Sequence, residues 1–294
     1  MEALLFHNPS AGDEEHSLDA LLDLLRGAGL AVHPLPAREP VPRAGRVAQA
    51  GLLVVAGGDG TVAKVAVRLT EHPVPLAVLP LGTANNLGRA LQTWETPEAF
   101  AAGWRQAQRR SLNLAYAEGP WGRRRFVEAA GFGAFARAIE RADHKGLKGV
   151  EAGRAAFRAI LARAEPARVV LTLDGAGREV ETLFVEVMNI ALFGPNLPLA
   201  PGAQPGDGWL DVVSLPPERR EAMLAWLEDP EAGPPPTYSW RARTVQVDWP
   251  GGSLRLDDDV LPQDLPIRAT LGIEPQAVQV LVPPADTATE RKPA

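Results

Sequence analysis

Short apolar runs and amphipathic segments alternate over the first 90 residues of the chain. Four apolar runs predict buried strands, and they lie at residues 3–7, 31–35, 52–56 and 76–79. Helical segments are expected at residues 18–25, 43–50 and 62–69, with one more beginning near Asn85 or Asn86. The run at residues 52–56 is continuously apolar, as expected for a strand covered on both faces. Strands that alternate with helices predict a parallel, doubly wound α/β sheet.

The pattern changes after about residue 110, where turn residues separate short apolar or alternating runs. This succession is typical of a β-rich domain. The runs lie at residues 111–116, 126–130, 168–173, 183–190, 210–215, 244–249, 254–256, 267–271 and 278–282. Helical insertions are expected at residues 150–164 and 218–227. We therefore predict an α/β domain over residues 1–115 and a β-rich, β-sandwich-like domain over residues 116–294, with the alternative that the last strand returns to the first domain.

The composition is that of a globular chain and excludes several kinds of chemistry. The 294 residues carry a formal net charge of −6 and include no cysteine. Disulfides, thiolate zinc sites, iron–sulfur clusters and a cysteine nucleophile are therefore excluded. No apolar run approaches the ~18–20 residues needed to cross a bilayer, and the chain does not open with a signal-peptide pattern. We therefore expect a cytoplasmic protein, and the acidic charge balance argues against nucleic acid as a partner.

The strongest local signal for chemistry is Gly57-Gly58-Asp59-Gly60-Thr61, which lies between a predicted strand and a predicted helix. Glycines let the backbone approach an anion closely and adopt positive φ. N–H groups at a helix start carry partial positive charge that favours phosphate, and Thr61 adds a hydroxyl donor. A carboxylate such as Asp59 among phosphate-binding groups suggests Mg²⁺. A tight glycine turn is the alternative, but the segment favours a phosphate-binding loop.

Two further loops follow predicted strands, at residues 8–12 and 82–86. Each loop alone is also typical of ordinary turns and helix caps. Together with the glycine-rich segment they line one edge of a single sheet, which is where α/β sheets bind ligands. Asn8, Thr83 and Asn85 offer neutral donors to phosphate, ribose or base.

These motifs resemble those of the diacylglycerol kinase catalytic-domain superfamily, in particular its soluble bacterial lipid kinases. The motifs are NPSAG at 8–12, GGDGTV at 57–62, PLGTANNLGRAL at 80–91, EAAGFG at 128–133, MNIALFGPNLPLAPGAQPGDGWLDVV at 188–213 and RLDDD at 255–259. NAD kinases and phosphofructokinases share a GGDG-type loop, but not the LGTANN and GDGWLDV motifs. The resemblance implies a nucleotide-binding domain like that of NAD kinase and phosphofructokinase, followed by a β-sandwich-like domain that binds the acceptor.

The resemblance also implies roles for individual residues. Positions that match the ATP-contacting loops are Asn8, Gly57, Gly58, Gly60, Thr61 and Thr83, with Asn85 in the same loop as Thr83. Asp59 matches the acidic residue near the catalytic metal. Asp207 matches a carboxylate that binds a structural Mg²⁺, for which the carbonyls of Gln204 and Trp209 are the other expected protein ligands.

Asp257 and Asp259 fall where the family carries an Asp-Gly-Glu motif, and one of them is expected to accept the proton of the lipid hydroxyl. A solvated acidic turn is the alternative for this segment. The sequence departs from the family here, because Asp258 replaces the glycine and Asp259 replaces the glutamate. If the glycine position requires positive φ, Asp258 is strained. Asn86 also stands where many relatives have aspartate.

These features predict an ATP- and Mg²⁺-dependent lipid kinase, with diacylglycerol as the expected acceptor and phosphatidic acid as the product. The alternatives are a small-molecule kinase similar to NAD kinase, and a catalytically weak regulatory protein that binds lipid or nucleotide. The expected partner is a lipid at a membrane surface, which the protein visits transiently, and a homodimer is possible. A locally basic middle region that includes Arg123, Arg124 and Arg125 fits such a surface, although ordinary solvated faces explain it equally well.

Overall fold

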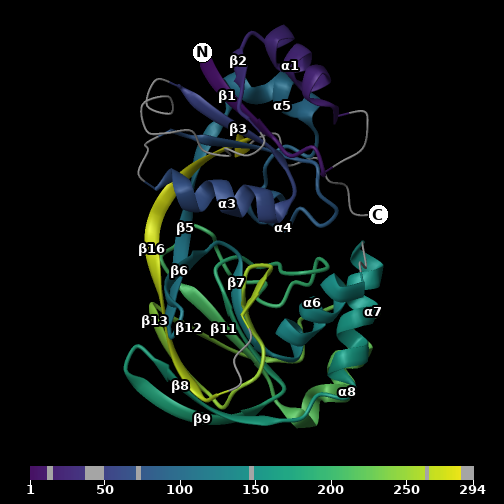
Figure 1. Ribbon diagram of the computed structural model, residues 1–294, viewed down its shortest axis with the longest axis vertical. Coiled ribbons are helices and arrows are strands. Elements are labelled where there is room, and N and C mark those ends of the chain that lie inside the picture. The colour runs from purple at the N-terminus through teal and green to yellow at the C-terminus, as the bar shows by residue number, and fades with distance from the viewer. Residues whose placement is uncertain (12–15, 37–49, 71–73, 146–148, 262–264, 286–294) are drawn as a thin grey trace. The chain divides into compact units, whose positions relative to one another are not determined.

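The computed structural model describes residues 1–11, 16–36, 50–70, 74–145, 149–261 and 265–285 (Figure 1). These residues form two compact units, which are Met1–Leu112 with Gln276–Ala294 (unit 1) and Asn113–Pro275 (unit 2). The helix expected at residues 43–50 lies almost wholly outside the described residues. The domains expected at residues 1–115 and 116–294 stay a prediction.

Unit 1 is built around a parallel sheet in the order β2-β1-β3-β4-β16. Its strands are β1 (Glu2–His7), β2 (Ala31–Pro34), β3 (Leu52–Gly57), β4 (Leu76–Pro80) and the last part of β16 (Ile267–Val282). In this order β1 and β3 are neighbours, although β2 separates them in sequence. From β1 the chain continues outward to β2 on one side, and from β3 it continues outward to β4 on the other side. In open α/β sheets such a switch point is the usual place for a ligand.

Helices cover the sheet of unit 1 on both faces (Figure 1). These helices are α1 (Leu18–Gly27), α3 (Asp59–Leu69), α4 (Asn86–Leu91) and α5 (Pro97–Gly103), followed by the short η2 (Trp104–Gln106). Helix α1 begins where the Ser17 side chain accepts the N–H of Ala20, and its leucines pack against one face of the strands. Every residue of β3 is buried, as its continuously apolar sequence predicts. The predicted doubly wound α/β fold is confirmed.

Unit 2 is a sandwich of two sheets. One sheet contains the last part of β5 (Gln108–Gly119), together with β6 (Gly122–Phe126), β8 (Ala167–Leu173), β9 (Ala176–Thr182), β13 (Thr244–Trp249) and the first part of β16. The other has the antiparallel order β12 (Tyr238–Ala242), β11 (Leu210–Leu215), β10 (Phe184–Met188), β7 (Ala129–Gly133), β14 (Leu254–Leu256) and β15 (Asp259–Leu261). Apolar side chains from both sheets, such as Val187 and Val247, form the core between them. The predicted β-sandwich-like fold is therefore confirmed.

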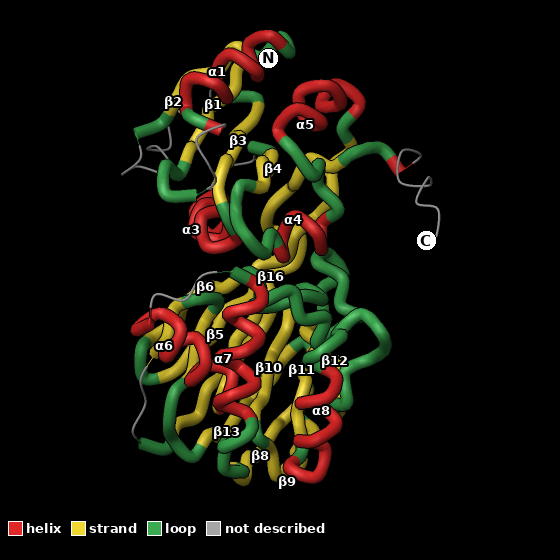
Figure 2. Tube along the Cα trace, turned by 90° about the vertical axis from the view of Figure 1, so that its right-hand side faces the viewer, coloured by secondary structure: helices red, strands yellow, loops and turns green. Residues whose placement is uncertain are grey.

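Helices cover the outer face of the second sheet of unit 2 (Figure 2). These are α6 (Ala134–Lys145), α7 (Val150–Leu161) and α8 (Arg220–Trp226), the last preceded by η3 (Pro217–Arg219). Phe135 and Phe157 pack from α6 and α7 against Phe184 and Met188 of β10. Side chains on the two faces of β10 therefore enter two different cores.

Several elements differ from the sequence-based expectation. The runs at residues 267–271 and 278–282 form one strand, β16, and the run at 126–130 is divided between β6 and β7. Strands β9, β12 and β15, most of β6, and helices α5 and α6 were not predicted. Strand β9 lies at the edge of its sheet and is mostly exposed, so its sequence AGREVET has no apolar run to reveal it.

Candidate active site

The first group of candidate residues lies at the switch point of the unit 1 sheet. Asn8 follows β1, and Thr61 lies in the segment that follows β3. The Asn8 side-chain amide donates to the Thr61 hydroxyl at 2.9 Å, while its main-chain N–H donates to the carbonyl of Ala56 at 2.9 Å. The structure thus brings two of the predicted nucleotide-binding residues into direct contact.

The glycine-rich segment is the start of a helix rather than a loop. Helix α3 begins at Asp59, three residues before the expected start, with Gly58 as its N-cap residue at φ −85°. None of Gly57, Gly58 and Gly60 has a positive φ, so the expectation of left-handed glycines is wrong. Glycine is needed here for close approach: a Cβ on Gly82 would lie 2.5 Å from the Cα of Gly58. The first turn of α3 presents N–H groups and partial positive charge, which favour an anion.

The Asp59 carboxylate connects the α3 start to the next loop. Its Oδ2 accepts the N–H of Asn86 at 3.0 Å, and its Oδ1 accepts the N–H of Leu87 at 2.9 Å. Asp59 therefore caps α4, a structural role that the sequence did not predict. The metal role of Asp59 stays a prediction.

The loop after β4 is held by Asn85. Its side-chain amide donates to the carbonyl of Gly82 at 2.6 Å, and its Oδ1 accepts the N–H of Gly82 at 2.9 Å. Asn85 is in the left-handed region at φ 49°. Thr83 lies between these residues and is exposed. Asn85 thus shapes the loop, and the hydroxyl of Thr83 is accessible to a ligand.

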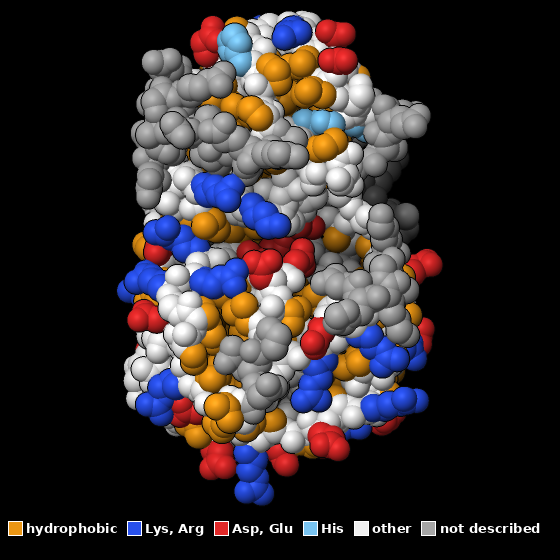
Figure 3. All heavy atoms as spheres, viewed as in Figure 1, with side chains coloured by type: hydrophobic (Ala, Val, Ile, Leu, Met, Phe, Trp, Pro, Cys, Tyr) orange, Lys and Arg blue, Asp and Glu red, His pale blue; other side chains and the backbone are white. Residues whose placement is uncertain are grey.

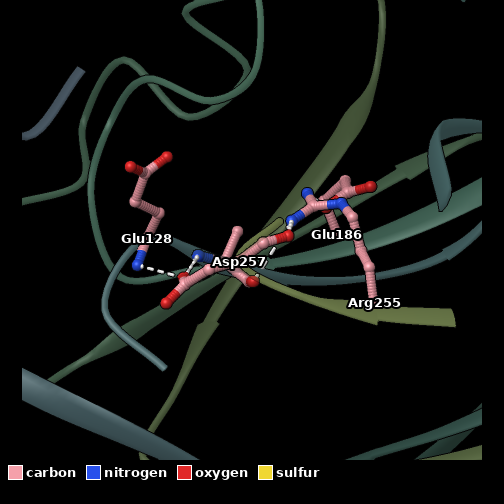
Figure 4. Close-up of polar contacts among 5 residues, drawn as sticks. Glu128, Glu186, Arg255 and Asp257 are labelled. Atoms are coloured by element: carbon pink, nitrogen blue, oxygen red, sulfur yellow. Dashed lines mark hydrogen bonds and ion pairs between the residues drawn. The ribbon is translucent and has the colours of Figure 1, made fainter. Parts of the chain in front are cut away.

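The second group of candidate residues lies in unit 2, at the turn between β14 and β15. The Asp257 Oδ1 accepts the N–H of Glu128 at 2.7 Å (Figure 4). It also accepts the N–H groups of Val127 at 3.1 Å and Ala129 at 3.3 Å. Oδ2 accepts the N–H of Val127 at 3.0 Å. The N–H of Asp257 donates to the carbonyl of Ala129 at 2.9 Å. Three consecutive amides thus hold this carboxylate in place.

The backbone strain in this turn falls on a different residue from the expected one. Asp257 has φ 49°, whereas Asp258 does not have a positive φ. The replacement of the family glycine by Asp258 therefore does not force a left-handed conformation on that residue. Aspartate visits this region more readily than most residues, and the amide contacts hold Asp257 there.

The environment of Asp257 changes its acidity. Burial raises the pKa of the Asp257 carboxyl to about 6, the N–H donors of Glu128 and Val127 oppose the shift, and the charge of Asp258 adds to it. A carboxyl with a pKa close to neutrality is suited to accept and release a proton near pH 7. Such shifts are frequent among catalytic groups, although structural networks produce them too.

Asp259 differs from Asp257 in its surroundings. Its carboxylate is exposed and pairs with Arg124 at 2.7 Å. Arg123 and Arg125 both pair with Glu274, at 3.0 and 2.9 Å. These arginines are therefore largely neutralised by nearby acids, and Figure 3 shows acidic and basic side chains interspersed over the visible surface of unit 2.

At the predicted structural metal site, Asp207 forms an ion pair with Arg241. The Asp207 Oδ1 accepts the N–H of Trp209 at 3.0 Å, and Arg241 donates to its Oδ2. The carbonyl of Gln204 accepts the N–H of Asp207 at 3.4 Å. Burial raises the pKa of the neighbouring Asp211 to about 6, Arg241 opposes the shift and Asp207 adds to it.

Arg241 thus balances the charge of Asp207 in this arrangement. Over the described ranges, three or more acidic or histidine side chains do not gather in a way that could hold a metal. The magnesium role of Asp207, Gln204 and Trp209 stays a prediction.

Three buried charged residues next to the Asp257 turn were given no role by the sequence reasoning. They are Glu128, Glu186 and Arg255. A signal was present for two of them, because Glu186 and Arg255 are the single charged residues in the otherwise apolar strands FVEVM and LRL. A charge at a fully buried strand position needs a partner, and the sequence does not say which one.

Comparisons with known proteins agree with this architecture. Residues 2–117 match the family model of the diacylglycerol kinase catalytic domain, and residues 128–282 match that of the YegS C-terminal NAD kinase beta sandwich-like domain. A protein of Pseudomonas aeruginosa named "Probable lipid kinase YegS-like" is 32% identical over 222 residues, which cover 72% of this chain and 71% of that protein. The chain belongs to the diacylglycerol kinase family of lipid kinases. It is thus a phosphotransferase with an alcohol acceptor.

A further relative and a solved structure are also similar to this chain. A diacylglycerol kinase of Mycobacterium tuberculosis is 29% identical over 251 residues, which cover 79% of this chain and 76% of the relative. A crystal structure of a diacylglycerol kinase from Bacillus anthracis shares the fold with a TM-score of 0.69, at 18% identity and over 97% of both chains. Kinases of this family use ATP, typically with Mg²⁺. In the described part of this lipid kinase, no helix has both the length and the apolar character to span a bilayer.

Proposed function

We propose that this lipid kinase transfers the γ-phosphate of ATP to diacylglycerol in the presence of Mg²⁺ and forms phosphatidic acid. Relatives named diacylglycerol kinase favour this acceptor. The observation that carries the nucleotide part of the proposal is the junction of three loops at the switch point. There the side chain of Asn8 bonds Thr61, and Asp59 bonds the start of α4.

In this proposal the triphosphate binds at the start of α3. The helix N-terminus supplies N–H donors and partial positive charge, and the main chain of Gly57, Gly58 and Gly60 is proposed to contact the phosphate oxygens. The side chains of Asn8 and Thr61 add neutral donors, as does the exposed hydroxyl of Thr83. Asn85 contributes by holding the conformation of the Thr83 loop.

The hydroxyl oxygen of the lipid attacks the γ-phosphorus of ATP. A new P–O bond forms, the bond from the γ-phosphorus to the bridging oxygen breaks, and ADP leaves. We assign Asp257 as the base that accepts the hydroxyl proton. Its pKa of about 6 supports this role, because the carboxylate form is then the main one at neutral pH. Asp259 is the second candidate, and its pairing with Arg124 makes it less available.

Magnesium, when bound with the nucleotide, would neutralise charge on the phosphate oxygens. Asp59 is the proposed ligand on this chain, directly or through water, because it is a carboxylate in the first turn of α3 and Mg²⁺ prefers oxygen ligands. The same residue holds the first turn of α3 to α4. Asp59 would therefore link the position of the cation to the geometry of the phosphate-binding loops.

Diacylglycerol resides in a bilayer, so we propose that the kinase binds a membrane surface transiently. The arginines of residues 123–125 are paired with Glu274 and Asp259. Such pairing leaves little net positive charge to hold the protein at anionic headgroups. This favours brief contact over stable electrostatic anchoring.

The proposal is tested by incubating the protein with labelled ATP and separate acceptors: detergent-dispersed diacylglycerol, a sphingoid base and NAD. We expect label in phosphatidic acid only when Mg²⁺ is present. Label in NAD alone would select a small-molecule kinase, and nucleotide binding without any transfer would select a regulatory protein. Asp59→Asn should abolish transfer in a folded protein. The exposed α1 variant Asp23→Asn is the matched control and should retain full transfer.

A further inference from the structure

A buried ion pair lies beside the Asp257 turn. Arg255 on β14 and Glu186 on β10 are both fully buried, and the guanidinium Nη2 donates to Oε2 of Glu186 (Figure 4). Strand β7 lies between these two strands and places Gly131 opposite both residues. A Cβ on Gly131 would lie 2.4 Å from Oε1 of Glu186 and 2.7 Å from Nε of Arg255. The pair therefore meets across a strand position that has no side chain.

The strand pattern explains why Arg255 points to this side. Its neighbours Leu254 and Leu256 belong to the core between the two sheets, so Arg255 faces the helix-covered side. There its guanidinium carbon lies 3.2 Å from the centroid of the Phe193 ring and 5.5 Å from that of Phe135. The aromatic rings enclose the charge and add a favourable cation–π contact.

The remaining hydrogen bonds of the guanidinium reach the main chain of the candidate catalytic turn. Nη1 donates to the carbonyl of Asp257 at 3.0 Å and to the carbonyl of Ala129 at 3.2 Å. Ala129 is also one of the residues whose amides hold the Asp257 carboxylate. One side chain thus bridges Asp257 and the segment that binds its carboxylate.

Stability alone does not account for this arrangement. A buried ion pair is often no more stabilising than apolar residues of similar volume, because both charges lose their hydration. In the described structure, Oε1 of Glu186 and Nε of Arg255 have no hydrogen-bond partner. Hydrogen bonds therefore replace only part of the hydration that the two charges lose on burial. Both residues lie between apolar strand neighbours that an apolar pair would suit.

We propose that Arg255, held by Glu186, is a positioning residue that fixes the main chain of Asp257 so that its carboxylate meets the acceptor hydroxyl. This inference rests on the proposed role of Asp257 in phosphoryl transfer. The bond from Arg255 to the Asp257 carbonyl complements the bond from the Asp257 N–H to Ala129, so both main-chain polar groups of this left-handed residue are restrained. Loss of the bond from Arg255 loosens the turn, so that the carboxylate of Asp257 separates more often from the amides that hold it.

The test is the double variant Glu186→Met/Arg255→Met, which removes both charges together and leaves no unpaired buried charge. We expect it to fold with an unchanged or higher melting temperature. Its kcat for lipid phosphorylation should fall about 10- to 100-fold, with the KM for ATP unchanged. The control is Asp248→Asn/Arg268→Met, which removes an exposed Arg–Asp pair of the same unit and should leave kcat unchanged. A double variant with the kcat of the wild type would overturn the inference.

A second readout keeps this test separate from that of the proposed function. Amide hydrogen exchange should become faster at Val127, Glu128 and Ala129 in the double variant, and not in the control. Unchanged protection there overturns the positioning role even if the wild type phosphorylates no lipid. If the methionine variant does not fold, the pair Glu186→Gln/Arg255→Gln removes the charges with polar side chains, and the same changes in kcat and exchange are expected.

Discussion

The two groups of candidate active-site residues are assembled in different ways. In unit 1, each predicted loop is a short segment at the end of one strand, and parallel neighbours bring the loops to one edge. In unit 2, the carboxylate of Asp257 depends on strands that lie far apart in sequence. The Val127 N–H that it accepts is 130 positions away.

The two groups therefore differ in how their geometry depends on the sequence. The unit 1 edge relies on main-chain donors and on glycines that permit close approach, so its signature is local. The Asp257 turn relies on side chains whose partners are set by strand register, with Gly131 opposite both Arg255 and Glu186. Apart from Asp59, the proposed metal ligand, substitutions in the first group should therefore impair nucleotide binding, and those in the second should impair the chemical step.

The largest expected effect is on the chemical step. Asp257→Asn should lower kcat about 10²- to 10⁴-fold, because the amide cannot accept the hydroxyl proton. The KM for ATP should change little, as measured by steady-state kinetics. Asp259→Asn is the comparison and should lose less activity, since Asp259 is exposed and paired with Arg124. A greater loss of kcat in Asp259→Asn than in Asp257→Asn would show that Asp259, and not Asp257, is the base.

The next effect concerns the packing beneath the turn. Gly131→Ala should lower the free energy of unfolding by about 1–3 kcal/mol, because the new methyl group would overlap the Glu186 carboxylate. Urea denaturation measures this change. Gly177→Ala on β9 is the control, since a Cβ there meets no atom within 4 Å. Equal stability in the two variants would argue against the close contact at Gly131.

A smaller effect is expected from the unit 1 edge. Asn8→Ala removes the side-chain bond to Thr61 and should raise the KM for ATP about 5- to 10-fold, which corresponds to one hydrogen bond. The kcat should stay within about twofold of wild type, because the base is untouched. A fall in kcat with an unchanged KM for ATP would place Asn8 in the chemical step and remove the contrast between the two groups.

The smallest expected effect is on the pH dependence of stability. The pKa of Asp211 is raised from 3.8 to about 6 in the folded protein, so folding favours its protonated form. Its contribution to stability is fully present below pH 3.8 and is lost as the pH rises through about 6. Urea denaturation between these pH values should show that the free energy of unfolding falls less with rising pH in Asp211→Asn than in wild type. Glu186 and Asp257 shift in the same direction, so part of the fall should remain.

Local patterns predicted the regular parts of the fold. The spacing of the leucines in α1 predicts a helix, and the continuous apolar run of β3 predicts a buried strand, without information from any other segment. Strand β16 was harder, because its 16 residues pass through Pro275 and through Gln276 at φ 52°, which together resemble a break between two strands. Tertiary pairing maintains the strand where the local sequence favours a turn.

The candidate site shows the same division. The glycine-rich segment and the triple aspartate were evident as motifs, but the capping of α4 by Asp59 depends on how two loops meet. The role of Arg241 beside Asp207 likewise depends on the pairing of β11 with β12. These partners meet because of the way strands pair and loops pack in the folded chain. The spacing of residues along the sequence does not reveal this pairing.

The most direct test of the central claim is the pH profile of kcat for phosphate transfer to diacylglycerol. If Asp257 is the base, kcat should rise with pH through about 6 and level off above it, because the carboxylate form is the active one. The profile should lose this limb in Asp257→Asn, together with most of the activity. A wild-type kcat that does not change across this range, or an Asp257→Asn variant that keeps full kcat, would contradict the account.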